Sequence, residues 1–363
     1  MQTAIPCTIM RGGTSKGLYF HAADLPADRE MRNRVLLAAM GSPDIRQIDG
    51  IGGAHPLTSK VAVLSPSGRP DADIDYLFLQ VAVDKPEVSD SQNCGNILAG
   101  VGPWAIEHGV VPAQDGITPV RIHMVNTQAL AVAQIRTPGG VVEYDGEAQI
   151  DGVPGTAAAV LLDFLDIAGS SCGALLPTGS IVDTVEGVEV TCIDNGMPVV
   201  ILRAADFGKT GQENPEQLEG DQVLCQRIEA IRLAIGPRMN LGDVARKTVP
   251  KMSLVSLAQS GGTIATRTFI PRRVHEAIGV LGAVSVATAC MMPGSVAAAF
   301  APGVADAQSG RIKVEHPTGF FTVELEFDAA SSARKVKRAA LLRTARKLMR
   351  GEVYVPASVW AGP

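Results

Sequence analysis

A weak internal repeat relates the two halves of the 363-residue chain, and it constrains the fold more than any other feature. Residues 7–24 and residues 192–206 both begin at a cysteine and end in Ala-Ala-Asp. Further along each half, Cys94 and Cys290 each stand beside a run of small residues. Such landmarks recur in the same order at a nearly constant offset, which predicts a duplicated domain. Each half would then present a cysteine at the mouth of a helix, and both could face one cleft.

Hydrophobic patterning predicts more strands than helices in both halves. The expected strands are residues 8–10, 18–21, 61–65, 77–83, 121–125, 130–134, 188–193, 199–202, 253–257, 263–268, 311–314 and 320–327. The expected helices are residues 29–40, 96–107, 221–235, 274–290, 294–300 and 330–350. With short connections between them, these elements predict an α+β fold whose mostly antiparallel sheets wrap on helices.

The last expected helix is strongly basic, with eight lysines and arginines and no acidic residue between Arg334 and Arg350. Its apolar residues form one stripe, made of Val336, Ala340, Leu341, Ala345 and Leu348. Such a stripe favours a helix that lies on a sheet, with a solvated basic face, over a helix that binds nucleic acid. The net charge of −5 also argues against a nucleic-acid partner.

The N-terminal region and the cysteines bear on the compartment. Arg11 and Lys16 interrupt the first residues, which lack the apolar core of a secretory signal, and no apolar run is long enough to span a membrane. The six cysteines are scattered, with no Cys-x-x-Cys pair and no Cys/His cluster at zinc spacing. We therefore expect reduced thiols in a cytoplasmic protein, no membrane partner and no metal.

Three polar, glycine-dense segments, residues 10–17, 47–63 and 90–100, are the candidates for a ligand site. Glycine lets backbone amides approach a ligand closely. Amides at helix starts, together with the polar side chains of residues 11–16, would form a receptor for carboxylates or phosphates.

Two side chains in these segments could carry chemistry. Lys60 ends a loop and enters an apolar strand, where burial would favour the neutral amine, a form that can act as a base. The alternative is an ordinary solvated lysine at a strand edge. Cys94 precedes a helix, where free amides favour a thiolate, although a cysteine there can also be a small buried residue.

At these residues the sequence resembles a known family. The strings MRGGTSKG (10–17), QIDGIGG (47–53), LTSKVAV (57–63), QNCGN (92–96) and TACMMPGS (288–295) are similar to those of the cofactor-independent isomerases that include 4-oxalomesaconate tautomerase and 2-methylaconitate isomerase. The resemblance extends over nearly the whole chain. It implies the diaminopimelate epimerase fold, in which two similar domains each curl a mostly antiparallel sheet around a central helix. The domains expected are residues 1–183 with the returning strand 352–363, and residues 184–351.

The resemblance also implies site residues. The catalytic lysine corresponds to Lys60 and the active-site cysteine to Cys94. The substrate-binding residues implied in the first domain are Arg11, Gly13, Thr14, Ser15, Ser59, Gly95 and Asn96. Those implied in the second domain are Arg267, Gly294 and Ser295. Cys290 and Met291 would form a second-domain site, but the Met-Met-Pro after Cys290 departs from the epimerase pattern, which favours proton removal and return on one face.

The implied activity moves a proton on a small unsaturated polycarboxylate, most closely 4-oxalomesaconate in protocatechuate or gallate degradation, by keto–enol exchange or an allylic shift. No cofactor is expected. The alternatives are isomerisation of 2-methylaconitate or methylitaconate, two-base racemisation through Cys94 and Cys290, and a non-catalytic carboxylate-binding protein. A small polycarboxylate is the expected partner, and a homodimer is left open.

Overall fold

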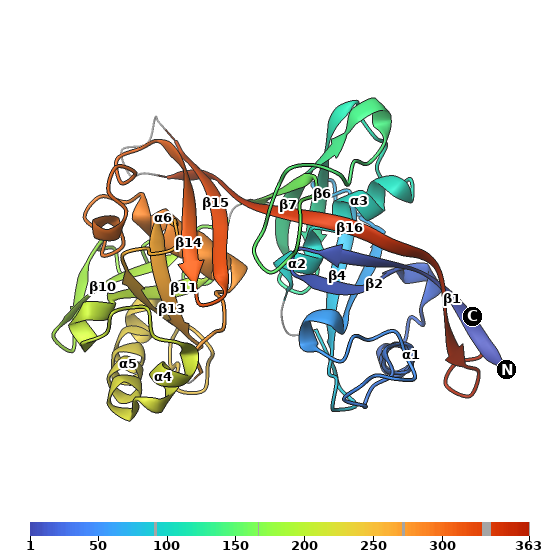
Figure 1. Cartoon of the computed structure of the whole chain (residues 1–363), viewed down its shortest axis with the longest axis horizontal. Helices are drawn as coiled ribbons and strands as arrows, with labels where there is room; N and C mark the ends of the chain where they lie inside the picture. Colours follow the sequence, from blue (N-terminus) through green and yellow to red (C-terminus); the bar gives the residue numbers. More distant parts are fainter. Residues whose placement is uncertain (91–92, 166, 271–272, 329–334, 363) are drawn as a thin grey trace. The chain divides into compact units, whose positions relative to one another are not determined.

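The computed structural model describes residues 1–90, 93–165, 167–270, 273–328 and 335–362. The chain divides into two compact units, Met1–Asp163 with Arg343–Pro363, and Phe164–Leu342 (Figure 1). Within the described residues, no helix is both long and apolar enough to cross a membrane.

The first unit is built mainly from strands. Its elements are β1 (Gln2–Gly12), β2 (Ser15–His21), η1 (Ala22–Asp24), α1 (Arg29–Met40), η2 (Pro56–Thr58), β3 (Lys60–Pro66), β4 (Ile74–Val81), β5 (Val88–Ser89), α2 (Gly95–Leu98), α3 (Val101–Glu107), β6 (Gly116–Met124), β7 (Ala129–Thr137), η3 (Pro138–Gly140), β8 (Ala159–Leu165) and the second half of β16 (Val336–Pro356).

The second unit repeats this composition. Its elements are β9 (Asp183–Val185), β10 (Val188–Asp194), β11 (Pro198–Arg203), η4 (Ala204–Phe207), α4 (Pro215–Gly220), α5 (Gln222–Ile235), η5 (Pro237–Met239), β12 (Lys251–Ser256), β13 (Ile264–Phe269), α6 (Val280–Cys290), η6 (Ala298–Phe300), β14 (Ser309–His316), β15 (Gly319–Phe327) and the first half of β16.

The two units share one strand topology. In the first, β1–β2 is antiparallel, β2–β3 parallel, β3–β4 antiparallel, β4–β6 parallel and β6–β7 antiparallel. In the second, β10–β11, β11–β12, β12–β13, β13–β14 and β14–β15 repeat the same alternation. A 3₁₀ turn follows β2 and β11 at the two Ala-Ala-Asp sequences. The predicted α+β fold with two similar domains is confirmed.

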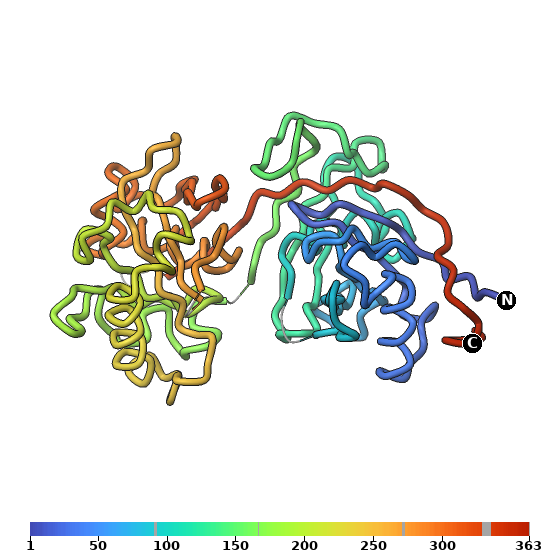
Figure 2. The backbone as a smooth tube through the Cα atoms, turned by 60° about the horizontal axis from the view of Figure 1, so that its bottom comes forward, coloured from blue at the N-terminus to red at the C-terminus, as the bar shows by residue number. Residues whose placement is uncertain are grey.

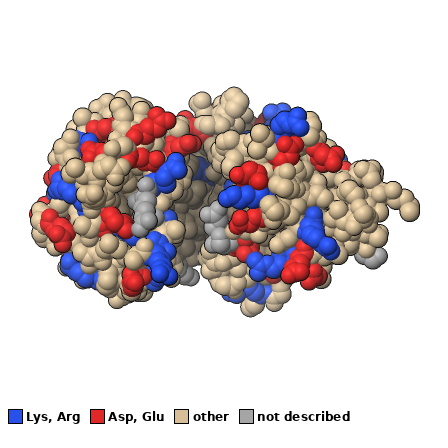
Figure 3. Space-filling model, turned by 90° about the horizontal axis from the view of Figure 1, so that it is seen from below, with Lys and Arg blue, Asp and Glu red and all other residues tan. Residues whose placement is uncertain are grey.

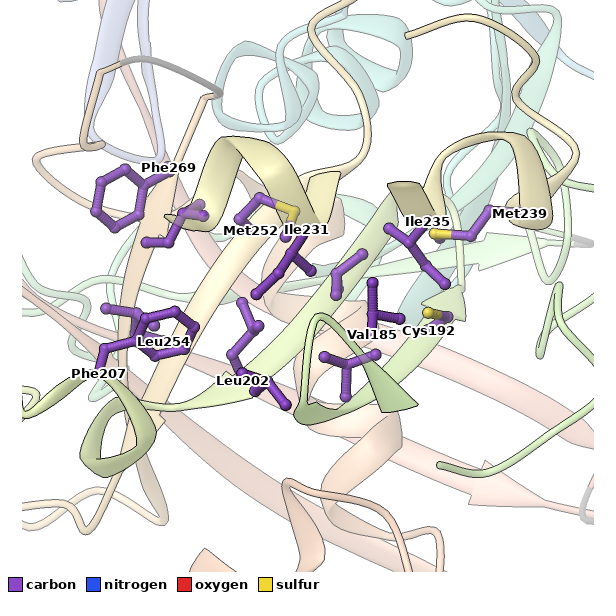
Figure 4. Packing of buried hydrophobic residues seen from close by; sticks show 14 of the residues in the cluster. Val185, Cys192, Leu202, Phe207, Ile231, Ile235, Met239, Met252, Leu254 and Phe269 are labelled. Carbon is purple, nitrogen blue, oxygen red and sulfur yellow. The ribbon is translucent and has the colours of Figure 1, made fainter. Parts of the chain in front are cut away.

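Helices pack on both faces of the strands in each unit. In the first unit α3 packs on β6 and β7, and α1 buries an apolar face against β1–β4. In the second, α6 packs on β10, β11, β14 and β15, whereas α5 places Ile231 and Ile235 over Leu202 and Met252 of the sheet (Figure 4). The apolar face of each helix is therefore buried by strands of its own unit.

The ends of the chain lie side by side in the first unit (Figure 2). Strand β1 pairs with β16 from Gln2, opposite Pro356, to Gly12, opposite Ala345. The contacts place the return to the first unit at Arg343, whereas the sequence analysis placed it at residue 352.

The first boundary also differs from the expected one, since the second unit begins at Phe164 and not at residue 184. Residues after 166 are bound to β10: the amide of Gly169 donates to the carbonyl of Asp194 at 2.7 Å, and Cys172 is part of the apolar core of the second unit.

The helix expected at residues 330–350 is wrong, because from Val336 onward this segment is strand β16; residues 329–334 lie outside the described part of the chain. Pairing with β15 and then with β1 satisfies its backbone and overrides its helical pattern. The helix expected at residues 294–300 is only the 3₁₀ turn η6, and the one at 96–107 is divided into α2 and α3.

Basic and acidic side chains are interspersed on the face of each unit drawn in Figure 3. Ion pairs occur in both units, such as Arg121 with Asp73 at 2.5 Å in the first and Arg311 with Glu324 at 2.6 Å in the second. This view shows no broad basic surface of the kind that nucleic acid requires.

Candidate active site

Lys60 begins β3 in the interior of the first unit, with only 6% of its surface exposed. Its Nζ donates a hydrogen bond to Oε1 of Gln80 at 2.6 Å and lies 5.1 Å from the centroid of the Phe78 ring. Gln80 is also its direct cross-strand neighbour on β4. The amine is therefore held over the sheet by one polar contact and one aromatic face.

The amide of Gln80 is oriented by the backbone that leads into Lys60. Its Nε2 donates to the carbonyls of Ser59 at 2.9 Å and Pro56 at 3.1 Å, which leaves Oε1 to accept from Lys60. Ser59 is fully buried, and its hydroxyl accepts a hydrogen bond from Nε2 of Gln47 at 2.7 Å. Ser59, predicted to bind substrate, thus already has a protein partner and supports the loop before Lys60.

Cys94 immediately precedes α2 and is a partly buried free thiol whose side chain makes no capping hydrogen bond. Two buried tyrosines hold this helix: Tyr76 donates to the carbonyl of Cys94 at 3.1 Å, and Tyr19 donates to that of Ile97 at 2.5 Å. Burial, and then the proximity of Cys94, raise the pKa of both phenols well above their ordinary value, so both remain donors.

The contacts made by β4 place Lys60 and Cys94 on one face of the sheet. Side chains at alternate positions of a strand share a face, so Tyr76, Phe78 and Gln80 point the same way. Tyr76 contacts Cys94, whereas Phe78 and Gln80 contact Lys60. The two residues predicted to be catalytic therefore lie on the same face of the sheet.

The turn between β1 and β2 packs against the first turn of α2. Gly13 has a positive φ of 51°, and a Cβ at this position would lie 2.1 Å from Oδ1 of Asn96. Only glycine fits there. Nδ2 of Asn96 then donates to Oγ1 of Thr14 at 3.1 Å. Gly95 and Asn96 begin α2, where backbone amides have no acceptor within the helix.

Two buried polar atoms at this turn have no hydrogen-bond partner among the described residues: Oγ of Ser15, whose residue is 1% exposed, and Oδ1 of Asn96. Buried polar groups are almost always paired, so unpaired ones at a glycine-rich turn indicate that a ligand completes them. This observation supports the predicted role of Ser15 and Asn96 in binding.

Arg11 already has protein hydrogen-bond partners, whereas a side chain that only binds an anion would have none. Its Nη1 donates to the carbonyl of Gly13 at 2.9 Å and to both oxygens of Thr344 at 3.0 Å. Burial, and then the nearby Arg346, lower the pKa of Arg11. Arg11 therefore fixes the β1–β2 turn while it remains beside other positive charge.

A cavity of about 360 Å³ opens beside this turn within the first unit. Thr14, Ser15 and Arg11 line it, as expected of binding residues. Lys16 and Thr58, which also line it, lie in two of the glycine-dense segments singled out from the sequence. The sequence analysis missed its other walls: Tyr144, Asp145, Ala148, Ile150, Gly152, Val153, Pro154, Gly155, Thr156, Ala157, Thr344, Arg346 and Leu348. Residues 344–348 were assigned to a helix, so nothing in the sequence placed them beside residues 11–16.

Arg343 is a further residue that sequence reasoning missed. Its side chain is buried, and burial lowers the pKa of its guanidinium to about 9, while the charge of Cys94 acts in the opposite direction. Arg343 and Cys94 are therefore close enough for their charges to interact.

The site residues predicted in the second half lie in the second unit. Arg267 is buried and donates from Nε to the carbonyl of Glu213 at 2.6 Å and from Nη1 to that of Thr266 at 2.9 Å. Oγ of Ser295 donates to the carbonyl of Ala289 at 2.6 Å, and Gly294 has a positive φ of 81°.

The expected position of Cys290 at the mouth of a helix is wrong. Cys290 is the last residue of α6 and is fully buried, as is Met291. Burial raises the pKa of the Cys290 thiol to about 12, so this sulfur keeps its proton. Cys94 is the N-cap residue of α2, and the N-cap residue of α6 is Gly279. A two-base arrangement of Cys94 and Cys290 has no support in this geometry.

The PrpF protein family model matches residues 2–356. The chain belongs to the PrpF family. It is 60% identical to a 4-oxalomesaconate tautomerase of Pseudomonas putida, over 100% of this chain and 99% of that protein. It is also 60% identical to a (4E)-oxalomesaconate Delta-isomerase of Novosphingobium, over 96% of this chain and 97% of that one.

A crystal structure of a methylitaconate-delta-isomerase has the same fold, with a TM-score of 0.88 and 36% identity over 99% of this chain and 97% of that one. These three relatives are named as isomerases or tautomerases, and each match covers nearly the whole length of both chains. They confirm the predicted family and the predicted class of enzyme.

Proposed function

We propose that this PrpF protein isomerises 4-oxalomesaconate by moving one proton, with Lys60 as the base. The observation that carries this proposal is the buried Lys60 amine on the same sheet face as Cys94. The names of two relatives at 60% identity support the choice of substrate.

The chemistry requires a base and groups that hold an oxyanion. A CH₂ group conjugated to a C=C–C=O system is acidic because the carbanion formed is a delocalised dienolate. Neutral Lys60 removes this proton, and the resulting ammonium returns it to the same conjugated system. Return to a carbon two positions along gives the allylic isomer, whereas delivery to oxygen gives the enol. One N–H of Lys60 can stay on Oε1 of Gln80 in both charge states.

The remaining residues bind and polarise. Ser15 can donate its unpartnered hydroxyl to a carboxylate, and the amides of Gly95 and Asn96 can hold a developing oxyanion, an effect worth about 3 kcal/mol per donor. Cys94, at the start of α2, polarises the conjugated system. The carboxylate contacts of Arg267, Gly294 and Ser295 stay predictions.

Solvent deuterium tests the proposal. The wild-type chain is incubated in D₂O with 4-oxalomesaconate, and NMR follows which carbon gains deuterium. Incorporation at the carbons that lose and gain the proton, at enzyme-dependent rates, is expected. The absence of enzyme-dependent exchange would reject this substrate.

Methylitaconate is the second candidate substrate, favoured by the structural similarity to a methylitaconate-delta-isomerase. The same NMR experiment with methylitaconate separates the two candidates, because the better substrate exchanges at the higher kcat/KM.

All six cysteines are free thiols, which supports a reducing compartment such as the cytoplasm.

A further inference from the structure

Three cations stand in one row across three neighbouring strands of the first unit. Arg11 on β1 is directly opposite Arg346 on β16 and directly opposite Lys16 on β2. Side chains of directly opposite residues share a sheet face, so all three point to one side. All three also line the cavity beside the β1–β2 turn.

Such a row is unfavourable without a ligand. Like charges directly opposite each other destabilise a strand pair, and burial, and then the proximity of Arg346, lower the pKa of Arg11. Among the described residues, none of the three cations forms an ion pair with an acidic side chain. Asp145 is the one carboxylate in the described cavity wall, so the wall keeps a net positive charge.

The rest of the cavity wall also favours an anion. Ser15 brings a buried hydroxyl that has no partner in the described structure, and Thr14 and Thr344 add two more hydroxyls. Lys60 and Cys94 are not among the residues that line the cavity, but two lining residues lead to them: Thr58 precedes Lys60 by two residues, and Thr14 is bonded to Asn96, two residues after Cys94.

We propose that the row Arg346, Arg11 and Lys16 is a subsite for a carboxylate of a tricarboxylate substrate, and that it favours tricarboxylates over dicarboxylates. The inference rests on the proposed function, because 4-oxalomesaconate carries one carboxylate more than methylitaconate. Arg346 is the exposed member of the row, and removal of its charge leaves the turn-fixing bonds of Arg11 in place.

Kinetics of Arg346→Gln test the subsite. We expect KM for 4-oxalomesaconate to rise by about ten-fold or more, the usual cost of losing a charge-assisted hydrogen bond, with a smaller change in kcat. The matched control is Arg350→Gln, which removes an exposed charge from the same strand outside the cavity wall and should leave KM unchanged. Equal KM values for Arg346→Gln and the wild type would overturn the proposal.

Inert acids give a second readout that needs no turnover. Propane-1,2,3-tricarboxylate should inhibit the wild type competitively and bind about ten-fold more tightly than glutarate in calorimetry, and Arg346→Gln should abolish that preference. Non-competitive inhibition, or equal binding of the two acids, would overturn a substrate subsite. A third result is also informative. If the tricarboxylate binds in an Arg346-dependent way but the chain does not isomerise 4-oxalomesaconate, the proposed function is rejected and the anion subsite is retained.

Discussion

Lys60 owes its environment to residues that are distant in sequence. Gly17 lies beside it on β2, where a Cβ would stand 2.4 Å from the Lys60 carbonyl, and Gln80 lies opposite it on β4. Phe78 covers the amine from the same strand. The apolar run after Lys60 predicted a buried lysine, but only strand pairing supplied the hydrogen-bond acceptor that positions its nitrogen.

Lys60→Met removes the proposed base while keeping an unbranched side chain of similar length. Deuterium exchange into 4-oxalomesaconate should fall by about 10²–10⁴-fold or more, the usual contribution of a general base. NMR exchange rates measure the loss, and thermal unfolding checks that the fold is intact. Lys85→Met, at an exposed lysine, is the control. Near-normal exchange in Lys60→Met would remove this residue from the mechanism.

Cys94→Ser should cost less than Lys60→Met, because a hydroxyl can still donate a hydrogen bond to the substrate, whereas methionine cannot act as a base. The comparison uses the same exchange assay. Mass spectrometry of the wild type during turnover tests the alternative. A covalent adduct on Cys94 would show that the thiol is a nucleophile, and Cys94→Ser should then lose more activity than Lys60→Met.

At the scale of elements, the site depends on how closely the β1–β2 turn approaches α2. The turn and the helix start touch through Gly13, Thr14 and Asn96, and no side chain other than hydrogen fits at the first of these. The glycine-rich sequence predicted a close approach to a ligand. The structure shows that the same glycine is needed for the approach of α2.

Gly13→Ala should therefore disturb both stability and activity. A positive φ costs a non-glycine residue about 1–3 kcal/mol, and the new Cβ would displace Asn96. We expect a lower urea midpoint and a kcat/KM reduced by about ten-fold or more. Gly68→Ala is the control, since its Cβ would meet open space. Equal activity of the two variants would contradict the proposed packing role.

At the scale of the whole molecule, duplication gives each unit its own core and its own buried thiols. Cys192 and Cys290 are both fully buried in the second unit, and burial raises the pKa of each thiol from 9.0 to about 12. Between pH 9.0 and about 12, these thiols therefore stay protonated in the folded chain but ionise in the unfolded chain.

Stability should consequently fall in alkali. The folded-state pKa is raised, so the stabilisation is complete below pH 9.0 and is lost as pH rises toward 12. Each thiol costs about 1.4 kcal/mol of unfolding free energy per pH unit in that window. Urea midpoints measured on either side of pH 9.0 test this, and Cys290→Ala should show a shallower pH dependence. An unchanged slope would mean that Cys290 ionises in the folded chain.

The sequence by itself determined most of the strands, the duplication and the segments around Lys60 and Cys94, because alternation, turns and motifs are local properties of the chain. It could not determine that residues 336–356 form a strand or that Arg346 stands opposite Arg11. Those facts depend on pairing between segments at opposite ends of the chain. Backbone hydrogen bonds formed across that distance outweigh local helical preference, so only the tertiary structure decided them.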